Sequence, residues 1–314
     1  MSDNCNENCL HKTSIGGQAV IEGVMMRGPK DMAIAVRKSD GQIVIDQKPV
    51  KIQNNKILKL PFIRGAVNFI SSMVTGVRAL MYSAEFVDIE EEGEPSRFDA
   101  FVEKVFGDKL KDAVIYFSVF ISLIFSIGLF ILLPAFLSGF VKNICDNHTL
   151  IIIVEGFVRI SLFLIYILLV SRMRDIQRVF EYHGAEHKSI HCYEHGEKLT
   201  VDNVKKHTRL HPRCGTSFLF IVMFISIIVF FFIKAETWYF RLIFRLLLLP
   251  VVAGISYEII KIAGKYDNVF TRIISKPGML MQYFTTREPD DSQIEVAIAS
   301  LNAVITGNRE DDKW

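Results

Sequence analysis

The segment 181–196, EYHGAEHKSIHCYEHG, contains the side chains most able to do chemistry, including four of the chain's eight histidines. Within it, His183, Glu186 and His187 form the pattern H-x-x-E-H. Residues four apart on a helix share a face, so the two imidazoles can bind one metal ion. Glu186 can then take a proton from a water whose pKa is lowered to about 7 by Zn²⁺. The pattern predicts metal-dependent hydrolysis, peptidase-like by analogy, with Glu186 as catalytic base.

Other side chains that could bind a metal lie outside the H-x-x-E-H pattern. His191 continues along the same side of the expected helix, and HPRC at 211–214 adds an imidazole and a thiolate. Glu258 lies near the expected inner end of the last apolar segment, where it can also pair with Lys261. We expect a divalent transition metal, with zinc as the first choice. The candidate ligands are His183, His187, His191, His211, Cys214 and Glu258.

The composition indicates the surroundings in which this chemistry takes place. Half of the residues are hydrophobic, phenylalanine is abundant at 25, and the mean hydropathy is +0.30. These values favour a membrane protein. A formal charge of +2 argues against nucleic acid as a partner, which usually requires a more basic domain. The five cysteines are scattered and show no disulfide spacing, which fits a reducing compartment or metal binding.

Four apolar segments predict transmembrane helices, for which about 20 apolar residues are needed. They cover residues 113–141, 150–170, 217–233 and 242–264, and the third is short enough to need Lys234 at its end to reach the interface. The loop 172–216 carries nine basic residues, against one in 142–149 and two in 234–241. The bias of basic residues toward the inner side predicts a multi-pass protein of the inner (cytoplasmic) membrane. The loop 172–216 and both termini are then cytoplasmic.

The fold class is therefore mainly α, with about four transmembrane helices, a small cytoplasmic β region and a cytoplasmic loop rich in histidine. Residues 31–50 alternate around Ser39-Asp40-Gly41, which predicts a β-hairpin. Apolar residues in 61–84 repeat at helical spacing, so this helix either lies in the membrane interface or packs on the sheet or the bundle. The expected divisions are a flexible tail 1–14, a β region 15–60, an amphipathic helix 61–84, an acidic linker 85–112, a transmembrane region 113–264 with its loop 172–216, and a C-terminal region 265–314 ending in a helix that starts near Asp291 or Ser292.

A straight continuation of the second apolar segment raises a geometric problem for the site. It would carry His183 about 18 Å beyond Val170, whereas His211 and Cys214 precede the third segment by only a few residues. The loop must therefore fold back if the clusters are to meet. Gly184 weakens a helix, so we expect a bend there.

Four motifs occur together in this chain: GGQAVIEGVMMRGP, FEYHGAEHKSIHCYE, HPRCGTSFL and EPDDSQIEVAIASL. Together they resemble the YqhQ-like family of bacterial membrane proteins, a domain of unknown function, over nearly the whole chain from about 15 to 304. The resemblance implies a metal-dependent membrane enzyme with no established substrate. By position it points to His183, Glu186, His187, His191, His211 and Cys214, with Glu22 as a lesser candidate. Cys5, Cys9 and His11 lie outside it.

Three classes of function remain open at the level of sequence. The first is a membrane hydrolase with an open metal site. The second is a scaffold or assembly factor in which the metal is structural or the histidines sense pH, and four closing protein ligands would favour it. The third is a transporter, which the small number of charges in the apolar segments disfavours, although Pro250 and Glu258 keep it open. The lipid bilayer is the expected partner, and the substrate and a homo-oligomeric state are left open.

Overall fold

The computed structural model describes residues 11–50, 58, 60–86, 108–142, 147–233, 238–266 and 268–313. Most of the expected tail 1–14 and of the acidic linker 85–112 falls outside these residues. The chain is mainly helical, with a small N-terminal antiparallel sheet. It divides into two compact units. The first combines Met1–Val87, Ile167–Ser226 and Leu247–Trp314, and the second combines Asp88–Tyr166 and Ile227–Leu246.

The sheet of the first unit is a four-stranded antiparallel meander in the order β1-β2-β3-β4. The strands are β1 (Gly16–Val20), β2 (Gly23–Arg27), β3 (Asp31–Arg37) and β4 (Ile43–Pro49). The expected hairpin in 31–50 is confirmed, because β3 and β4 pair in register from Asp31↔Pro49 to Arg37↔Ile43. Gly41 adopts φ 85° in the turn between them, a value that glycine reaches without strain.

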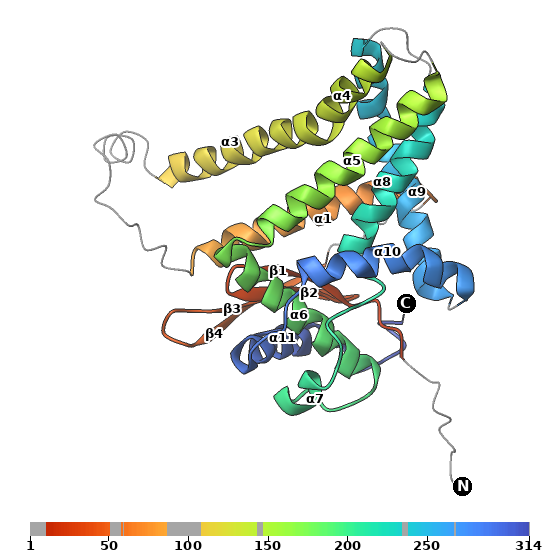
Figure 1. Cartoon of the computed structure of the whole chain (residues 1–314). Helices are drawn as coiled ribbons and strands as arrows, with labels where there is room; N and C mark the ends of the chain where they lie inside the picture. The colour runs from red at the N-terminus through yellow and green to blue at the C-terminus, as the bar shows by residue number, and fades with distance from the viewer. Residues whose placement is uncertain are drawn as a thin grey trace. The chain divides into compact units, whose positions relative to one another are not determined.

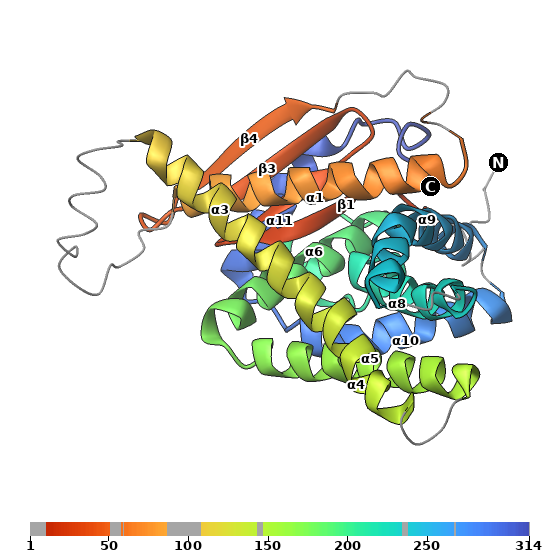
Figure 2. The same ribbon diagram turned by 90° about the horizontal axis from the view of Figure 1, so that it is seen from above.

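Each face of the sheet is covered by helices, as Figure 1 shows. Helices α6 (Arg174–Glu194) and α11 (Asp291–Val304) cover one face, where Tyr182 and Ile294 are fully buried. Helix α1 (Ile63–Ala84) covers the other face, where Ala79 packs with β-strand residues such as Val36. The amphipathic helix expected at 61–84 therefore places part of its apolar surface on the sheet. Figure 2 shows β1 as the edge strand nearest to α6.

Helix α6 is continuous through Gly184, so the bend expected there is wrong. The chain turns earlier instead, at residues 171–173, between α5 (His148–Val170) and α6. A Cβ at Gly184 would collide with the carbonyl oxygen of Arg287. The glycine thus allows close approach of two segments, and the Arg287 N–H donates to the Phe180 carbonyl at 2.9 Å in the same place.

Within the described residues, three helices or helical stretches are long and apolar enough to cross a membrane: Phe117–Val141, Thr149–Val170 and Leu242–Lys265. They correspond to the first, second and fourth expected segments. The first runs through α3 (Asp108–Ile127), the π-helix η2 (Gly128–Leu132) and α4 (Leu133–Lys142), and the last lies in α9 (Trp238–Lys265). The third expected segment forms α8 (Gly215–Phe231), an apolar helix of 17 residues.

In the second unit, Glu155 and Arg159 form an ion pair, with Arg159 Nη2 at 2.8 Å from Glu155 Oε1. Arg245 joins them by donating from Nη2 to Glu155 Oε2 at 2.7 Å. Both guanidinium groups also lie over the ring of Phe230. These partners reduce the cost of burying the three charges among apolar helices.

The C-terminal helices begin at well-formed caps. Asp290 caps α11: its side chain accepts from the Gln293 N–H, and its own N–H donates to the Gln293 side chain. This capping box confirms the start predicted near Asp291 or Ser292. Asn268 caps α10 (Val269–Thr285) in the same way. The short α7 (Val201–Lys205) interrupts the segment between α6 and α8.

Candidate metal centre

Three of the predicted ligands meet in the first unit. Helix α6 places His183 and His187 one turn apart, and the segment before α8 brings Cys214 to them. One ligand atom from each of the three residues lies within 4.8 Å of the other two. His183 Nε2 is 3.2 Å from Cys214 Sγ. Two imidazoles and a thiolate form a donor set suited to zinc.

The remaining ring nitrogens of the two histidines are held by backbone carbonyls. His183 Nδ1 donates to the Thr285 carbonyl at 2.8 Å, and His187 Nδ1 donates to the Arg209 carbonyl at 2.6 Å. Because Nδ1 faces a carbonyl in each ring, Nε2 is the nitrogen that can face a metal ion. Such outer partners orient ligand histidines in metal sites.

Glu186 lies beside this group and is 4% exposed. Its Oε1 accepts from the Gly17 N–H at 3.1 Å, while its Oε2 is buried without a hydrogen-bond partner among the described residues. Burial raises the pKa of Glu186, and the neighbouring His183 and His187 oppose that rise. A carboxylate oxygen left free at this place can act as a base.

Gly17 is a site residue whose role sequence reasoning missed. A Cβ at Gly17 would lie 2.6 Å from the Met25 carbonyl oxygen and 3.0 Å from Glu186 Cδ. Only glycine therefore lets β1 bring its amide to the carboxylate. The glycine-rich motif at 16–29 was the available signal, but its partner on α6 depends on tertiary structure.

The charges at the centre favour a thiolate. Burial by itself would raise the pKa of Cys214, but His187 and His183 hold it well below its usual value. Burial would likewise lower the pKa of His183, but the Cys214 thiolate and Glu186 raise it to about 9. In contrast, burial raises the pKa of Cys192 to about 11, so that thiol stays protonated. Cys214 is thus the cysteine prepared to bind a metal.

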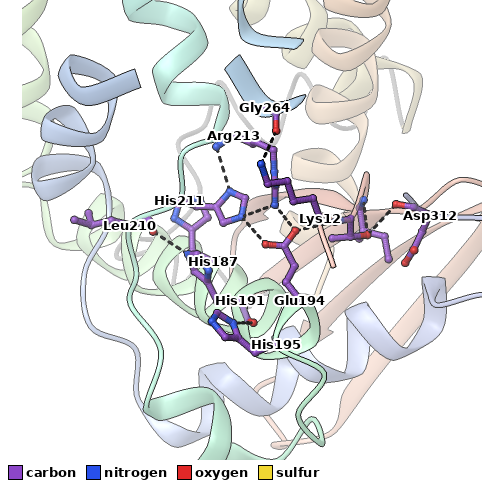
Figure 3. A network of polar contacts seen from close by, with 12 residues as sticks. Lys12, His187, His191, Glu194, His195, Leu210, His211, Arg213, Gly264 and Asp312 are labelled. Carbon is purple, nitrogen blue, oxygen red and sulfur yellow. Dashed lines mark hydrogen bonds and ion pairs between the residues drawn. The ribbon is translucent and has the colours of Figure 1, made fainter. Parts of the chain in front are cut away.

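His191 and His211 lie in a neighbouring group with Glu194, as Figure 3 shows. The Glu194 carboxylate accepts from the Thr13 N–H at 2.8 Å and forms an ion pair with Arg213. The guanidinium Nη2 of Arg213 is also 3.4 Å from His211 Nε2. One ligand atom from each of His191, Glu194 and His211 lies within 4.8 Å of the other two, so this second group could also hold a metal ion, with the Arg213 guanidinium beside it. The His187 and His211 rings are 5.6 Å apart.

Both histidines of this second group are kept neutral. Burial, with His211 as the next cause, lowers the pKa of His191 to about 3. Burial, followed by His187 and Arg213, lowers the pKa of His211 well below its usual value. His191 Nε2 donates to the Leu210 carbonyl at 2.9 Å, which satisfies its one ring proton.

The structure does not bring Glu258 or Glu22 into either group. Glu258 accepts from Arg64, with Nε 2.7 Å from Oε1, whereas the sequence suggested Lys261 as its simplest partner. Lys261, the partner that the sequence suggested, also acts electrostatically on Glu258. Glu22 forms an ion pair with Arg178.

The centre opens into a cavity of about 710 Å³. Residues of β1, α1, α6 and the start of α8 line it, including Gly17, Phe69, Glu186 and Phe218. All of these elements belong to the first unit. Glu186 and the three candidate ligands are among the residues that line the cavity.

Comparison with known proteins agrees with the resemblance noted in the motifs. The family described as "Protein of unknown function (DUF1385)" matches residues 60–307. The chain is also 36% identical over 293 residues to the "Uncharacterized protein YqhQ" of Bacillus subtilis (strain 168), and the match covers 92% of each chain. No solved structure matches. The range that matches the family contains His183, Glu186, His187 and Cys214.

Proposed function

Since the chain belongs to the family of proteins of unknown function DUF1385, we propose its function from the geometry of its own site. It is an integral membrane hydrolase that depends on a divalent transition metal, zinc first, and works at the cytoplasmic face of the cell membrane. The observation that carries this proposal is the free Oε2 of Glu186, buried beside three metal-ligand atoms and next to a cavity.

The residues present fit a metal ion. His183, His187 and Cys214 would hold it, because two histidine lone pairs and a thiolate converge while carbonyls fix the opposite ring nitrogens. Zinc bound there supplies Lewis acidity, which acidifies water and polarises a carbonyl group.

The chain's own groups then have separate tasks. Glu186 Oε2 takes a proton from the attacking water, and the Gly17 N–H holds Oε1 so that Oε2 stays directed at the site. The carbonyls of Thr285 and Arg209 keep both imidazoles in one tautomer. The raised pKa of Glu186 makes it a stronger base than an exposed carboxylate.

A second chemistry fits the same atoms. His183 Nε2 is 3.2 Å from Cys214 Sγ, and the Thr285 carbonyl orients the imidazole. This arrangement supports a thiolate nucleophile with an imidazolium beside it, without a metal. The two chemistries differ in their response to chelators and to alkylation of Cys214.

The first experiment is elemental analysis of the full chain purified in detergent, beside the double variant His183→Ala/His187→Ala. We expect about one metal per chain in the wild type and loss of the metal in the double variant. His195→Ala is the matched control, because His195 is exposed on the same helix end and lies outside the first group. Glu186→Gln should retain the metal and lose hydrolysis by about 10²–10⁴-fold.

Other results would select the alternatives. Bound metal with no dependence of any hydrolysis on Glu186 would favour a structural metal in a scaffold. Hydrolysis that survives a chelator but is lost in Cys214→Ala would favour the cysteine nucleophile. Zinc protection of Cys214 from iodoacetamide would place the thiolate among the ligands.

A further inference from the structure

The edge strand β1 borders the cavity beside the candidate metal centre, with Gly17 exposed and Ala19 buried. In an antiparallel pair, alternate residues direct their N–H and C=O groups to the partner strand, and the others direct them away from it. Gly17 directs its backbone groups away from β2, because its N–H donates to Glu186 rather than to β2. Ala19, two residues on, has the same orientation. Among the described residues, none hydrogen-bonds the Gly17 carbonyl or either backbone group of Ala19.

Both ends of this edge are closed by other parts of the chain. Before β1, Thr13 pairs with Lys313 in an isolated antiparallel bridge. After β1, the Ile21 N–H donates to Ser83 Oγ at 3.2 Å. The open stretch is therefore short and lies between two closed ends. Proteins usually cover or shorten such edges, because unpaired backbone groups attract another strand.

The cavity runs along this open stretch, since residues 14–19 form part of its lining. Apolar side chains from α1 and from the start of α8 line it as well, namely Phe69, Met73, Phe218 and Leu219. The side chains of the candidate metal centre open into the same cavity. The edge, the apolar surfaces and the reactive groups thus border one space.

We propose that the substrate is an extended polypeptide segment, which pairs as an added strand with the open edge of β1. This inference rests on the proposed hydrolase function and names its substrate class. Backbone pairing through the Gly17 carbonyl and both groups of Ala19 would hold the segment, as in other cases of strand addition. Alternate side chains of the segment would contact the apolar surfaces near Phe69 and Phe218, so apolar residues are expected at every second position.

The position of Glu186 fits this arrangement. Its Oε1 bonds to Gly17 of the edge strand, so the carboxylate lies beside the stretch to which an added strand would pair. In the reaction, Glu186 accepts a proton from water and the water oxygen bonds to the peptide carbonyl carbon. The C–N bond then breaks, and the proton passes to the departing amine.

Lipid is the other class that an apolar cavity near membrane helices suggests. An acyl chain would fill the apolar part of the cavity but would leave the backbone groups of Gly17 and Ala19 without partners. Burying unpaired polar groups is costly. The open edge therefore favours a polypeptide.

The test uses the full-length Glu186→Gln chain in detergent and a short fluorescein-labelled peptide that alternates leucine with serine. Fluorescence polarisation measures the affinity for a series of peptides, each of which carries a methyl group on a different backbone nitrogen. If the peptide pairs as a strand, methylation should weaken binding about tenfold at every second residue, where the N–H is paired. Methylation of the residues between them should change binding little. Hydrogen exchange of residues 15–20 should slow when the peptide binds.

A pair of protein variants tests the same contact from the other side. Ala19→Pro removes an N–H that faces away from β2, a place where an edge strand tolerates proline. Ala19→Val adds similar bulk and keeps the N–H. We expect Ala19→Pro to bind the peptide at least about tenfold more weakly than Ala19→Val. The methylation series remains decisive if Ala19→Pro does not fold.

The outcomes separate this inference from the proposed function. Binding without the period of two, or no binding at all, overturns strand addition. Release of fatty acid from phosphatidylethanolamine vesicles, with no peptide bound, overturns it in favour of lipid while leaving a hydrolase. Periodic peptide binding to the Glu186→Gln chain, with no cleavage by the metal-loaded wild type, supports the docking edge and counts against the hydrolase.

Discussion

At the scale of single residues, the neighbours Gly16 and Gly17 have opposite surroundings. A Cβ at Gly17 would meet the Met25 carbonyl oxygen and Glu186, whereas a Cβ at Gly16 would meet nothing within 4 Å. Gly17 is therefore required for the contact between β1 and Glu186 on α6, and Gly16 is not. Sequence motifs alone give both glycines equal weight.

This difference predicts unequal effects of the same substitution. Gly17→Ala should destabilise the protein by about 1–3 kcal/mol, because the Met25 carbonyl belongs to the ladder and cannot easily shift. It should also reduce hydrolysis by displacing Glu186 while leaving metal content unchanged. Gly16→Ala is the control for stability and metal content. Thermal unfolding and elemental analysis check both variants, and equal melting temperatures would contradict the crowding at Gly17.

The buried neutral histidines predict loss of stability in acid. The pKa of His191 falls from 6.5 to about 3 on folding, mainly through burial. Between these two pH values, His191 is protonated in the unfolded chain and neutral in the folded chain. The free energy of unfolding therefore decreases as pH falls from 6.5 toward 3. At pH 5 the contribution of His191 is up to about 2 kcal/mol.

Thermal unfolding of the metal-free protein in detergent, at pH 7.5 and pH 5, measures this effect. The wild type should lose more stability between the two pH values than His191→Gln, which has no titrating ring. The same loss in both proteins would show that His191 is not held neutral by the fold.

At the scale of elements, the position of α6 depends on a close contact with the segment after α10. Gly184 admits the Arg287 carbonyl, and the nearby Thr285 carbonyl accepts from His183 Nδ1 at 2.8 Å. The close contact at Gly184 therefore also helps to orient His183, a candidate metal ligand. A helix and an extended segment position the site together.

Gly184→Ala should consequently weaken metal binding. The added methyl group would push away the segment that carries the Thr285 carbonyl, and loss of such an outer partner typically costs 10–100-fold in metal affinity. Competition with a zinc-binding dye measures the affinity. Gly215→Ala is the control, because it lies next to Cys214 and its Cβ would meet nothing within 4 Å. Equal affinities in the two variants would contradict this role.

At the scale of the whole molecule, the first unit constrains the membrane topology. The sheet, α6 and α11 contact one another, so in the proposed membrane protein we expect the segments before, between and after the apolar helices to lie on one side. An even number of crossings must then separate them. Helix α8 should therefore cross together with α9, although its 17 residues span only about 25 Å. A short helix can be accommodated by local thinning of the bilayer.

Labelling with a membrane-impermeant maleimide in intact cells tests this topology. Native Cys145 and a cysteine introduced by Glu236→Cys should be labelled from outside, whereas Cys5 and Cys9 should react only after permeabilisation. Failure to label position 236 from outside, with Cys145 labelled, would mean that α8 does not cross. The positive-inside bias of the sequence predicts the same sidedness.

The sequence by itself determined the features that depend on neighbours along the chain. Helical spacing places His183 and His187 on one face, the apolar runs predict the long helices, and the capping residues mark the start of α11 near Asp290. These features follow from local backbone geometry and local hydrophobic patterns, which a short window contains. The turn at Gly41 belongs to the same class.

Only the tertiary structure decided which distant residues meet. Glu186 bonds to Gly17 across 169 positions, and Glu258 pairs with Arg64 across 194, so one glutamate joins the centre and the other does not. Cys214 reaches His183, while His211 joins Arg213 and Glu194 instead. The physical reason is that such contacts arise from the burial of whole helix and sheet faces against one another. No local pattern encodes the register of those faces.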